Sequence, residues 1–133
     1  MILLDTHTLV WLSEGNDKLG GRSLSLINKA LKSKELFASS ISFWEVAMLV
    51  EKKRLKMSLS VELWRKELLD NGLQEISLNG KIAIQSAILP NFHGDQADRM
   101  IVATAINTSL TLCTADEKIL DWQSQLTRIN AKI

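Results

Sequence analysis

The sequence is poor in several features that would direct a chain to other classes of protein. Its 133 residues include one cysteine, Cys113, which excludes an internal disulfide and a zinc site built from several thiolates. The one proline, Pro90, leaves no proline-rich linker, and no apolar run approaches the ~20 residues of a membrane span. No G-x-G-x-x-G follows the first apolar segment, so a dinucleotide-binding fold is not expected. The N-terminus lacks basic residues and reaches Asp5 at once, unlike a signal peptide, so we expect a cytoplasmic location.

The composition is that of one globular domain over residues 1–133, with 46% hydrophobic and 23% charged residues. The net charge of +1 conceals an uneven distribution. Residues 18–66 hold eleven Lys and Arg against four Asp and Glu, whereas both flanking segments are net acidic. Two interpretations stay open: a phosphate-binding face beside an acidic pocket, or helix faces that are simply solvated.

Short apolar segments alternate with longer segments of helical spacing, which predicts an α/β domain with a mostly parallel sheet. About four to five short strands are expected, with helices on both faces. In such a sheet, ligands bind at the carboxyl ends of the strands. The predicted strands are 2–4, 35–38, 73–78, 110–113 and 126–129, and the predicted helices are 9–12, 24–31, 42–54, 61–69, 82–89, 95–108 and 116–122.

Four acidic residues fall at this predicted edge of the sheet: Asp5, Glu45, Asp98 and Asp116. Each also has a purely structural interpretation. Ser42-x-x-Glu45 and Thr114-x-x-Glu117 fit capping boxes, Asp116 suits the dipole of a first helical turn, and Asp5 and Asp95 can cap the helices that follow them. Helix capping does not require all four acids to share one edge, and this shared placement favours a common site.

A cluster of carboxylates has a defined chemistry. Two carboxylates about 4 Å apart repel by about 4 kcal/mol at an effective dielectric near 20, so the cluster takes up protons or a cation. Oxygen ligands without His or Cys favour Mg²⁺ or Mn²⁺ over Zn²⁺, and two such ions support phosphodiester hydrolysis. Without metal, we expect a raised pKa for at least one of these acids.

Four segments resemble the motifs of PIN domains, specifically VapC-type toxins of bacterial toxin–antitoxin pairs, in the family's order and over the whole chain. They are Leu3–Leu12, Ser40–Val46, His93–Ala103 and Leu112–Leu120. One departure is Gln96, which stands where a proline often follows the first aspartate of the third motif. The resemblance implies a single PIN-like three-layer α/β/α domain and a metal-dependent endoribonuclease that leaves a 5′-phosphate and a 3′-hydroxyl.

The resemblance also assigns roles to residues. Asp5, Asp98 and Asp116 would be the main ligands of Mg²⁺ or Mn²⁺, and Glu45 would bind metal through water or orient the attacking water. Thr6, Asp95 and Thr114 would support the site. The implied partners are an RNA substrate, a second copy of the chain and a small VapB-type antitoxin that blocks the pocket. Operator DNA would be bound only through the antitoxin, and no membrane is involved.

Further residues have two interpretations each. Arg99 is a candidate RNA or antitoxin contact, or forms an ion pair that holds a helix start. Lys52, Lys53 and Arg54 are candidates for the same contacts, or are cations that favour the end of a helix. Trp11, Trp44 and Trp64 lie on apolar stripes and are interpreted as core residues rather than as platforms for base stacking. Trp44 could equally pack at a dimer face.

Two alternative functions remain open from the residues. One is another Mg²⁺-dependent phosphoryl hydrolase, either a DNA nuclease or a phosphatase. The other is a non-catalytic binding module in which the acids act only as caps.

Overall fold

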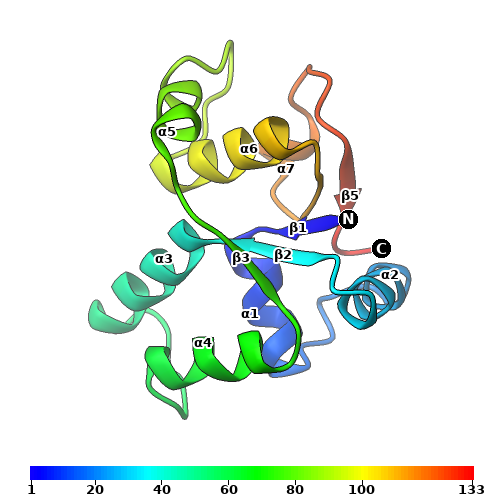
Figure 1. Cartoon of the computed structure of the whole chain (residues 1–133), viewed down its shortest axis with the longest axis vertical. Coiled ribbons are helices and arrows are strands. Elements are labelled where there is room, and N and C mark those ends of the chain that lie inside the picture. Colours follow the sequence, from blue (N-terminus) through cyan, green and yellow to red (C-terminus); the bar gives the residue numbers. More distant parts are fainter.

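The computed structural model describes all residues, 1–133, as seven helices and five strands (Figure 1). No helix has both the length and the apolar character needed to cross a bilayer. The strands are β1 (Ile2–Leu4), β2 (Leu36–Ser39), β3 (Gln74–Ile76), β4 (Thr111–Thr114) and β5 (Arg128–Asn130). The helices are α1 (Thr6–Glu14), α2 (Gly21–Lys32), α3 (Ser40–Glu51), α4 (Val61–Asp70), α5 (Gly80–Ala87), α6 (Gln96–Thr108) and α7 (Glu117–Leu120).

All five strands are parallel and lie in the order β3-β2-β1-β4-β5. The chain therefore starts at the centre of the sheet, extends to one edge through β2 and β3, and then builds the other half with β4 and β5. The order reverses between β1 and β4, where Leu4 pairs with Cys113. Such a reversal leaves a crevice at the carboxyl ends of the two strands, because their connections leave in opposite directions.

The alternation of side chains along β1 separates two cores, one on each face of the sheet. Ile2 and Leu4 pack into a cluster with residues of α1, α2, α3 and α4, whereas Leu3 packs into a cluster with residues of α6 and α7. Figure 1 shows α5, α6 and α7 on one side of the sheet and α1, α2 and α4 on the other. The predicted α/β class, parallel sheet and three-layer arrangement are confirmed.

Each predicted element is present, with shifted ends. The shift that matters for the site is in α3, which spans Ser40–Glu51 rather than the predicted 42–54. The helix starts directly after β2 because the Ser39 hydroxyl accepts a hydrogen bond from the Ile41 N–H. It ends before Lys53, which has a left-handed backbone with φ of 57°. Glu45 consequently lies in the second turn of α3, not in the first as predicted.

Candidate active site at the carboxyl edge of the sheet

The register of β1 and β4 places Asp5 beside Thr114. The Asp5 N–H donates to the Cys113 carbonyl over 3.2 Å, which continues the strand pairing by one residue. The Asp5 side chain is 6% exposed and accepts from the Thr8 N–H at 3.0 Å, while the Thr114 hydroxyl donates to its other oxygen. The Thr114 oxygen also accepts from the Asp116 N–H at 3.0 Å. The buried Thr114 therefore links the two acids that follow the central strands.

Glu45 and Asp98 come to the same edge from α3 and α6, which pack against each other. A buried hydrogen bond of 3.0 Å from the Thr6 hydroxyl to the Ser42 oxygen joins α1 to α3 one turn before Glu45. Asp98 lies in the first turn of α6, and its N–H donates to the Asp95 carboxylate at 2.8 Å. The Glu45 and Asp98 carboxylates are half-buried and have no hydrogen-bond or ion-pair partner in the protein.

These acids line one cavity of about 460 Å³. It brings together all four acids predicted from the sequence, together with the predicted supporting residues Thr6 and Asp95, and Thr114 lies buried beside it. The cavity lining is Asp5, Thr6, His7, Trp11, Lys18, Glu45, Asp95, Asp98, Ala115, Asp116 and Lys132. Sequence reasoning assigned no role to the two lysines, because nothing in their local sequence marks them.

The clearest electrostatic effect in the cavity is on the pKa of Asp98. The pKa of this carboxyl is raised to about 7, mainly by burial and then, in decreasing order, by the negative charges of Asp95, Asp116, Glu45 and Asp5. The expectation that at least one acid has a raised pKa without metal is thus confirmed. A hard divalent cation among these oxygens would relieve both the burial of charge and the repulsion, so the donor set fits Mg²⁺ or Mn²⁺.

Three of the acids also cap helices. Asp5, Asp95 and Asp116 are the N-caps of α1, α6 and α7, and with these contacts no three acidic, His or Cys side chains lie close enough together to hold one ion. The capping interpretation is therefore right for Asp5 and Asp95. Asp116 is a cap rather than a first-turn acid. The two capping boxes were wrong predictions, because Ser39 caps α3 and Asp116 caps α7. Asp95 and Asp116 each use one carboxylate oxygen for the cap and retain the other for a ligand.

The PIN domain family model matches residues 2–122. The chain belongs to the PIN domain family. The prediction made from the four motifs is thereby confirmed.

Comparison with known proteins shows which PIN domains and complexes this chain is similar to. It is 32% identical over 119 residues to ribonuclease VapC22 of Mycobacterium tuberculosis, covering 89% of this chain and 88% of that protein. The fold is similar to VapBC2 from Rickettsia felis bound to a promoter DNA fragment, with a TM-score of 0.73 at 19% identity over 98% of both chains. A toxin–antitoxin complex from Klebsiella pneumoniae has a TM-score of 0.65 at 23% identity, again over 98% of both chains.

The basic residues singled out in the sequence lie outside the carboxylate cavity of this PIN domain. The Arg99 guanidinium donates to the carbonyls of Ser86, Ala87, Leu89 and Phe92, and it forms no ion pair. Arg99 therefore holds the segment after α5 against α6 and has no free donor pair for a phosphate. Lys52, Lys53 and Arg54 are exposed at the end of α3, and their contact with RNA or antitoxin stays a prediction.

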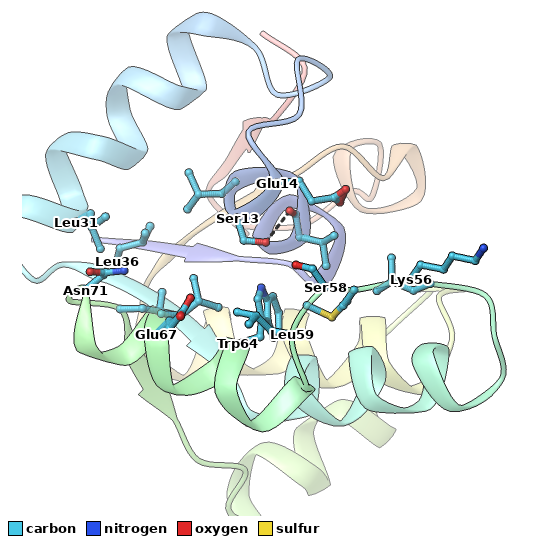
Figure 2. A pocket seen from close by; sticks show the side chains of 16 residues that line it. Ser13, Glu14, Leu31, Leu36, Lys56, Ser58, Leu59, Trp64, Glu67 and Asn71 are labelled. Atoms are coloured by element: carbon cyan, nitrogen blue, oxygen red, sulfur yellow. Dashed lines mark hydrogen bonds between the residues drawn. The ribbon is translucent and has the colours of Figure 1, made fainter.

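A second cavity, of about 520 Å³, lies between α1, α4 and the segment before α4 (Figure 2). Ten of its sixteen lining residues are hydrophobic, among them Leu12, Leu59 and Leu68. Trp64 is 5% exposed, and its indole N–H has no hydrogen-bond partner. Figure 2 shows the indole nitrogen pointing toward the space between Ser13 and Ser58. The cavity is thus an apolar groove with one unused donor.

The three tryptophans interpreted as core differ in burial. Trp64 is buried and packs edge-on against Phe43 with ring centroids 5.7 Å apart, and Trp11 is half-buried. Trp44 is 53% exposed, so its interpretation as a core residue was wrong, whereas its alternative placement at a dimer face stays a prediction. Its position on α3 faces away from the sheet because Phe43 and Val46 take the buried face.

Proposed function

We propose that this PIN domain is a Mg²⁺- or Mn²⁺-dependent endoribonuclease and the toxin of a toxin–antitoxin pair. The observation that carries the proposal is the cavity in which five carboxylates from four separate segments converge, with no protein cation within 4.0 Å of any of them. Like charges gathered in one cavity, with Asp5 buried and three of the others half-buried, lower the stability of the fold, and a bound cation offsets that cost. The similarity to a ribonuclease over most of the chain supports RNA as the substrate class.

The roles follow from how each acid is held. Asp5, Asp98 and Asp116 would hold the metal by drawing closer together than they are in the structure, where no three such side chains are near enough to hold one ion. Asp98 has both carboxylate oxygens free for it. When bound, the ion supplies a Lewis acid for the phosphate and lowers the pKa of a water. Glu45 is half-buried with a free carboxylate, which suits it to orient or deprotonate the attacking water. Thr114 fixes Asp5 and Asp116 in one arrangement through its two hydrogen bonds.

The test is cleavage of total RNA by the purified chain with Mg²⁺. Discrete fragments from the wild type, and none with chelator or with Asp5→Asn, are expected. Asp5→Asn is the matched control because asparagine retains an oxygen for the Thr8 N–H and still caps α1. Cleavage that persists in Asp5→Asn or in chelator would overturn the proposal.

Single-stranded DNA and a phosphate monoester test the alternative hydrolases. We expect neither to be turned over at the rate seen with RNA. Mg²⁺-dependent turnover of either at an equal or higher rate would replace the ribonuclease with a DNA nuclease or a phosphatase. If neither RNA, DNA nor the monoester is turned over and calorimetry detects no Mn²⁺ binding, the remaining alternative is a non-catalytic binding module.

For the partner, we propose a small antitoxin that docks in the apolar cavity of Figure 2. The similar folds include a toxin–antitoxin complex, and the cavity has an apolar lining and an unpaired Trp64 N–H that a partner's carbonyl would accept from. Operator DNA would be reached through the antitoxin. Trp64→Phe keeps an aromatic side chain, although a smaller one, and removes the donor, so it should weaken capture of the co-expressed antitoxin, measured by calorimetry, about 3- to 10-fold. Unchanged affinity would remove this donor from the interface.

We also propose a homodimer. Trp44 on α3 is 53% exposed, and Ile84 and Ile88 at α5 are 67% and 71% exposed, which leaves apolar surface for a second copy to cover. Analytical ultracentrifugation of the wild type and of Trp44→Glu tests this. A dimer that the substitution dissociates is expected, and a wild-type monomer at all concentrations would contradict it.

A further inference from the structure

Part of the wall of the carboxylate cavity is basic and aromatic rather than acidic. It consists of Lys18, from the loop between α1 and α2, Lys132, which follows β5, and Trp11 on α1. We call these three residues the basic wall. Lys132 is far from Trp11 and Lys18 in the sequence, and only the fold brings it to the same cavity.

Backbone contacts hold the two lysines on adjacent segments. The Gly20 N–H donates to the Ala131 carbonyl at 2.8 Å, which joins the loop of Lys18 to the segment of Lys132. The approach is so close that a Cβ on Gly20 would lie 2.3 Å from the carbonyl carbon of Ile133, so only glycine fits. Asx turns then fix each lysine, with Lys18 N–H donating to Asn16 and Lys132 N–H to Asn130, at 2.9 and 3.0 Å.

The charges of these lysines are not used within the protein. The three ion pairs of the structure join Met1 to Glu35, Arg65 to Glu75 and Lys66 to Asp70, and none involves the basic wall. Lys18 lies with its ammonium 5.9 Å from the centroid of the Trp11 ring, a cation–π arrangement. Two cations that share a cavity with five acids, yet neutralise none of them directly, are available to an anionic ligand.

We propose that Lys18 and Lys132 bind backbone phosphates of a single-stranded RNA next to the cleaved bond, and that Trp11 stacks on a neighbouring base. The substrate class rests on the proposed function, whereas the placement rests on the residues. A groove that combines cations with an aromatic ring is the arrangement that binds single strands, because every base has a π-face. Trp11 is half-buried in the cavity wall, and Lys18 lies over its ring. Trp11 offers its ring face when Lys18 moves from the ring to a phosphate.

The experiment measures binding of a fluorescein-labelled single-stranded RNA of mixed sequence as a function of salt. It uses the Asp5→Asn chain with Mg²⁺, so that cleavage does not consume the probe. Each phosphate contact on a single strand contributes about 0.7 to the slope of log affinity against log salt concentration. Lys18→Gln and Lys132→Gln should each lower the slope by about 0.7 and the affinity at 0.1 M salt about 5-fold.

The matched control is Lys29→Gln with Lys32→Gln. Both lysines are exposed on α2 outside the cavity, and the double variant removes the same charge as the Lys18 and Lys132 pair. It should leave the slope nearly unchanged. Trp11→Leu should lower the affinity about 5- to 100-fold without changing the slope, because stacking releases no counterions.

Two outcomes overturn the inference. One is a Lys18 and Lys132 double variant with the same slope as the Asp5→Asn chain, and the other is an equal fall in the control. Failure of the proposed function has a different signature: wild-type chain that releases no RNA fragments with Mg²⁺. If the wild-type chain does not cleave RNA but the lysine variants still lower the salt slope, the basic wall binds nucleic acid and the chain is not a nuclease.

Discussion

The two cavities of this PIN domain are similar in volume, about 460 and 520 Å³, and opposite in chemistry. The first has two hydrophobic residues among eleven and collects carboxylates at the ends of the central strands. The second has ten among sixteen and collects leucines between α1 and α4. Size alone therefore says little about what a cavity binds, and the unpaired groups in each are more informative.

The unpaired groups of the two cavities differ in hydrogen-bonding character. In the carboxylate cavity the free groups are acceptors, Glu45 and Asp98, which call for a cation. In the apolar cavity the free group is a donor, the Trp64 N–H, which calls for a carbonyl or hydroxyl oxygen. A buried polar group without a partner costs about 1–3 kcal/mol, so each cavity is stabilised by a ligand of the complementary kind.

The comparison is tested most strongly by neutralising free acids. Asp98→Asn and Glu45→Gln should each lower Mg²⁺-dependent RNA cleavage at least about 100-fold, the upper end of the loss seen for groups that only support metal ligands. The fold should persist, because neither carboxylate makes a hydrogen bond in the protein. Glu67→Gln, the same change at an exposed acid lining the apolar cavity, is the control and should cleave normally. Wild-type rates in Asp98→Asn and Glu45→Gln would remove them from the site.

The carboxylate cavity was predictable because its acids are tied to strand ends. Asp5 follows β1 and Asp116 follows β4, and the parallel order brings these ends together whatever the helices do. The capping box at Ser42 failed because Ser39, the last residue of the mostly buried β2, caps α3 before Ser42 can. A local motif does not specify which of two neighbouring hydroxyls a helix start uses.

The remaining features depend on contacts between distant residues. Lys18 and Lys132 are 114 positions apart and meet only because Gly20 allows the backbone near Ile133 to approach. The apolar cavity has no sequence signature at all, since Leu12, Leu68 and Trp64 have the helical spacing of ordinary core residues. Its existence depends on how far α4 stands from α1.

A smaller effect is expected from a change beside the carboxylate cavity that removes no charge. A Cβ on Gly94 would lie 2.6 Å from the buried Phe92 ring and 2.9 Å from the Asp98 Cβ, so Gly94→Ala must shift the local structure around these two residues. Cleavage should fall about 10-fold through misplacement of this carboxylate. Gly80→Ala is the control, because nothing lies within 4 Å of its added Cβ. Equal cleavage rates in the two variants would show that the position of Asp98 is not critical.

The apolar cavity is tested by the reverse change, addition of a charge. Leu59 is 37% exposed at its rim, so Leu59→Asp should leave the fold and RNA cleavage intact. A buried carboxylate at the interface should lower the affinity for the co-expressed antitoxin about 10-fold by calorimetry. If cleavage fell and antitoxin affinity did not, the roles of the two cavities would be reversed.

The smallest expected effect is on the way the free energy of unfolding depends on pH. The pKa of Asp98 is about 7 in the folded chain and near 3.8 when unfolded, so between these values the folded state holds a proton that the unfolded state releases. The free energy of unfolding of metal-free protein therefore falls as pH rises, by at most about 1.4 kcal/mol per pH unit. Solvent screening reduces this slope, and we expect the free energy of unfolding to fall by about 1 kcal/mol in total between pH 5 and pH 8 in urea titrations.

Asp98→Asn should flatten the profile, and Mg²⁺ should restore wild-type stability at pH 8 because it binds only the folded, ionised site. A wild-type profile that rises with pH, or is as flat as that of Asp98→Asn, would mean that burial and repulsion do not raise the pKa of Asp98, and the contrast between the two cavities would lose its electrostatic basis.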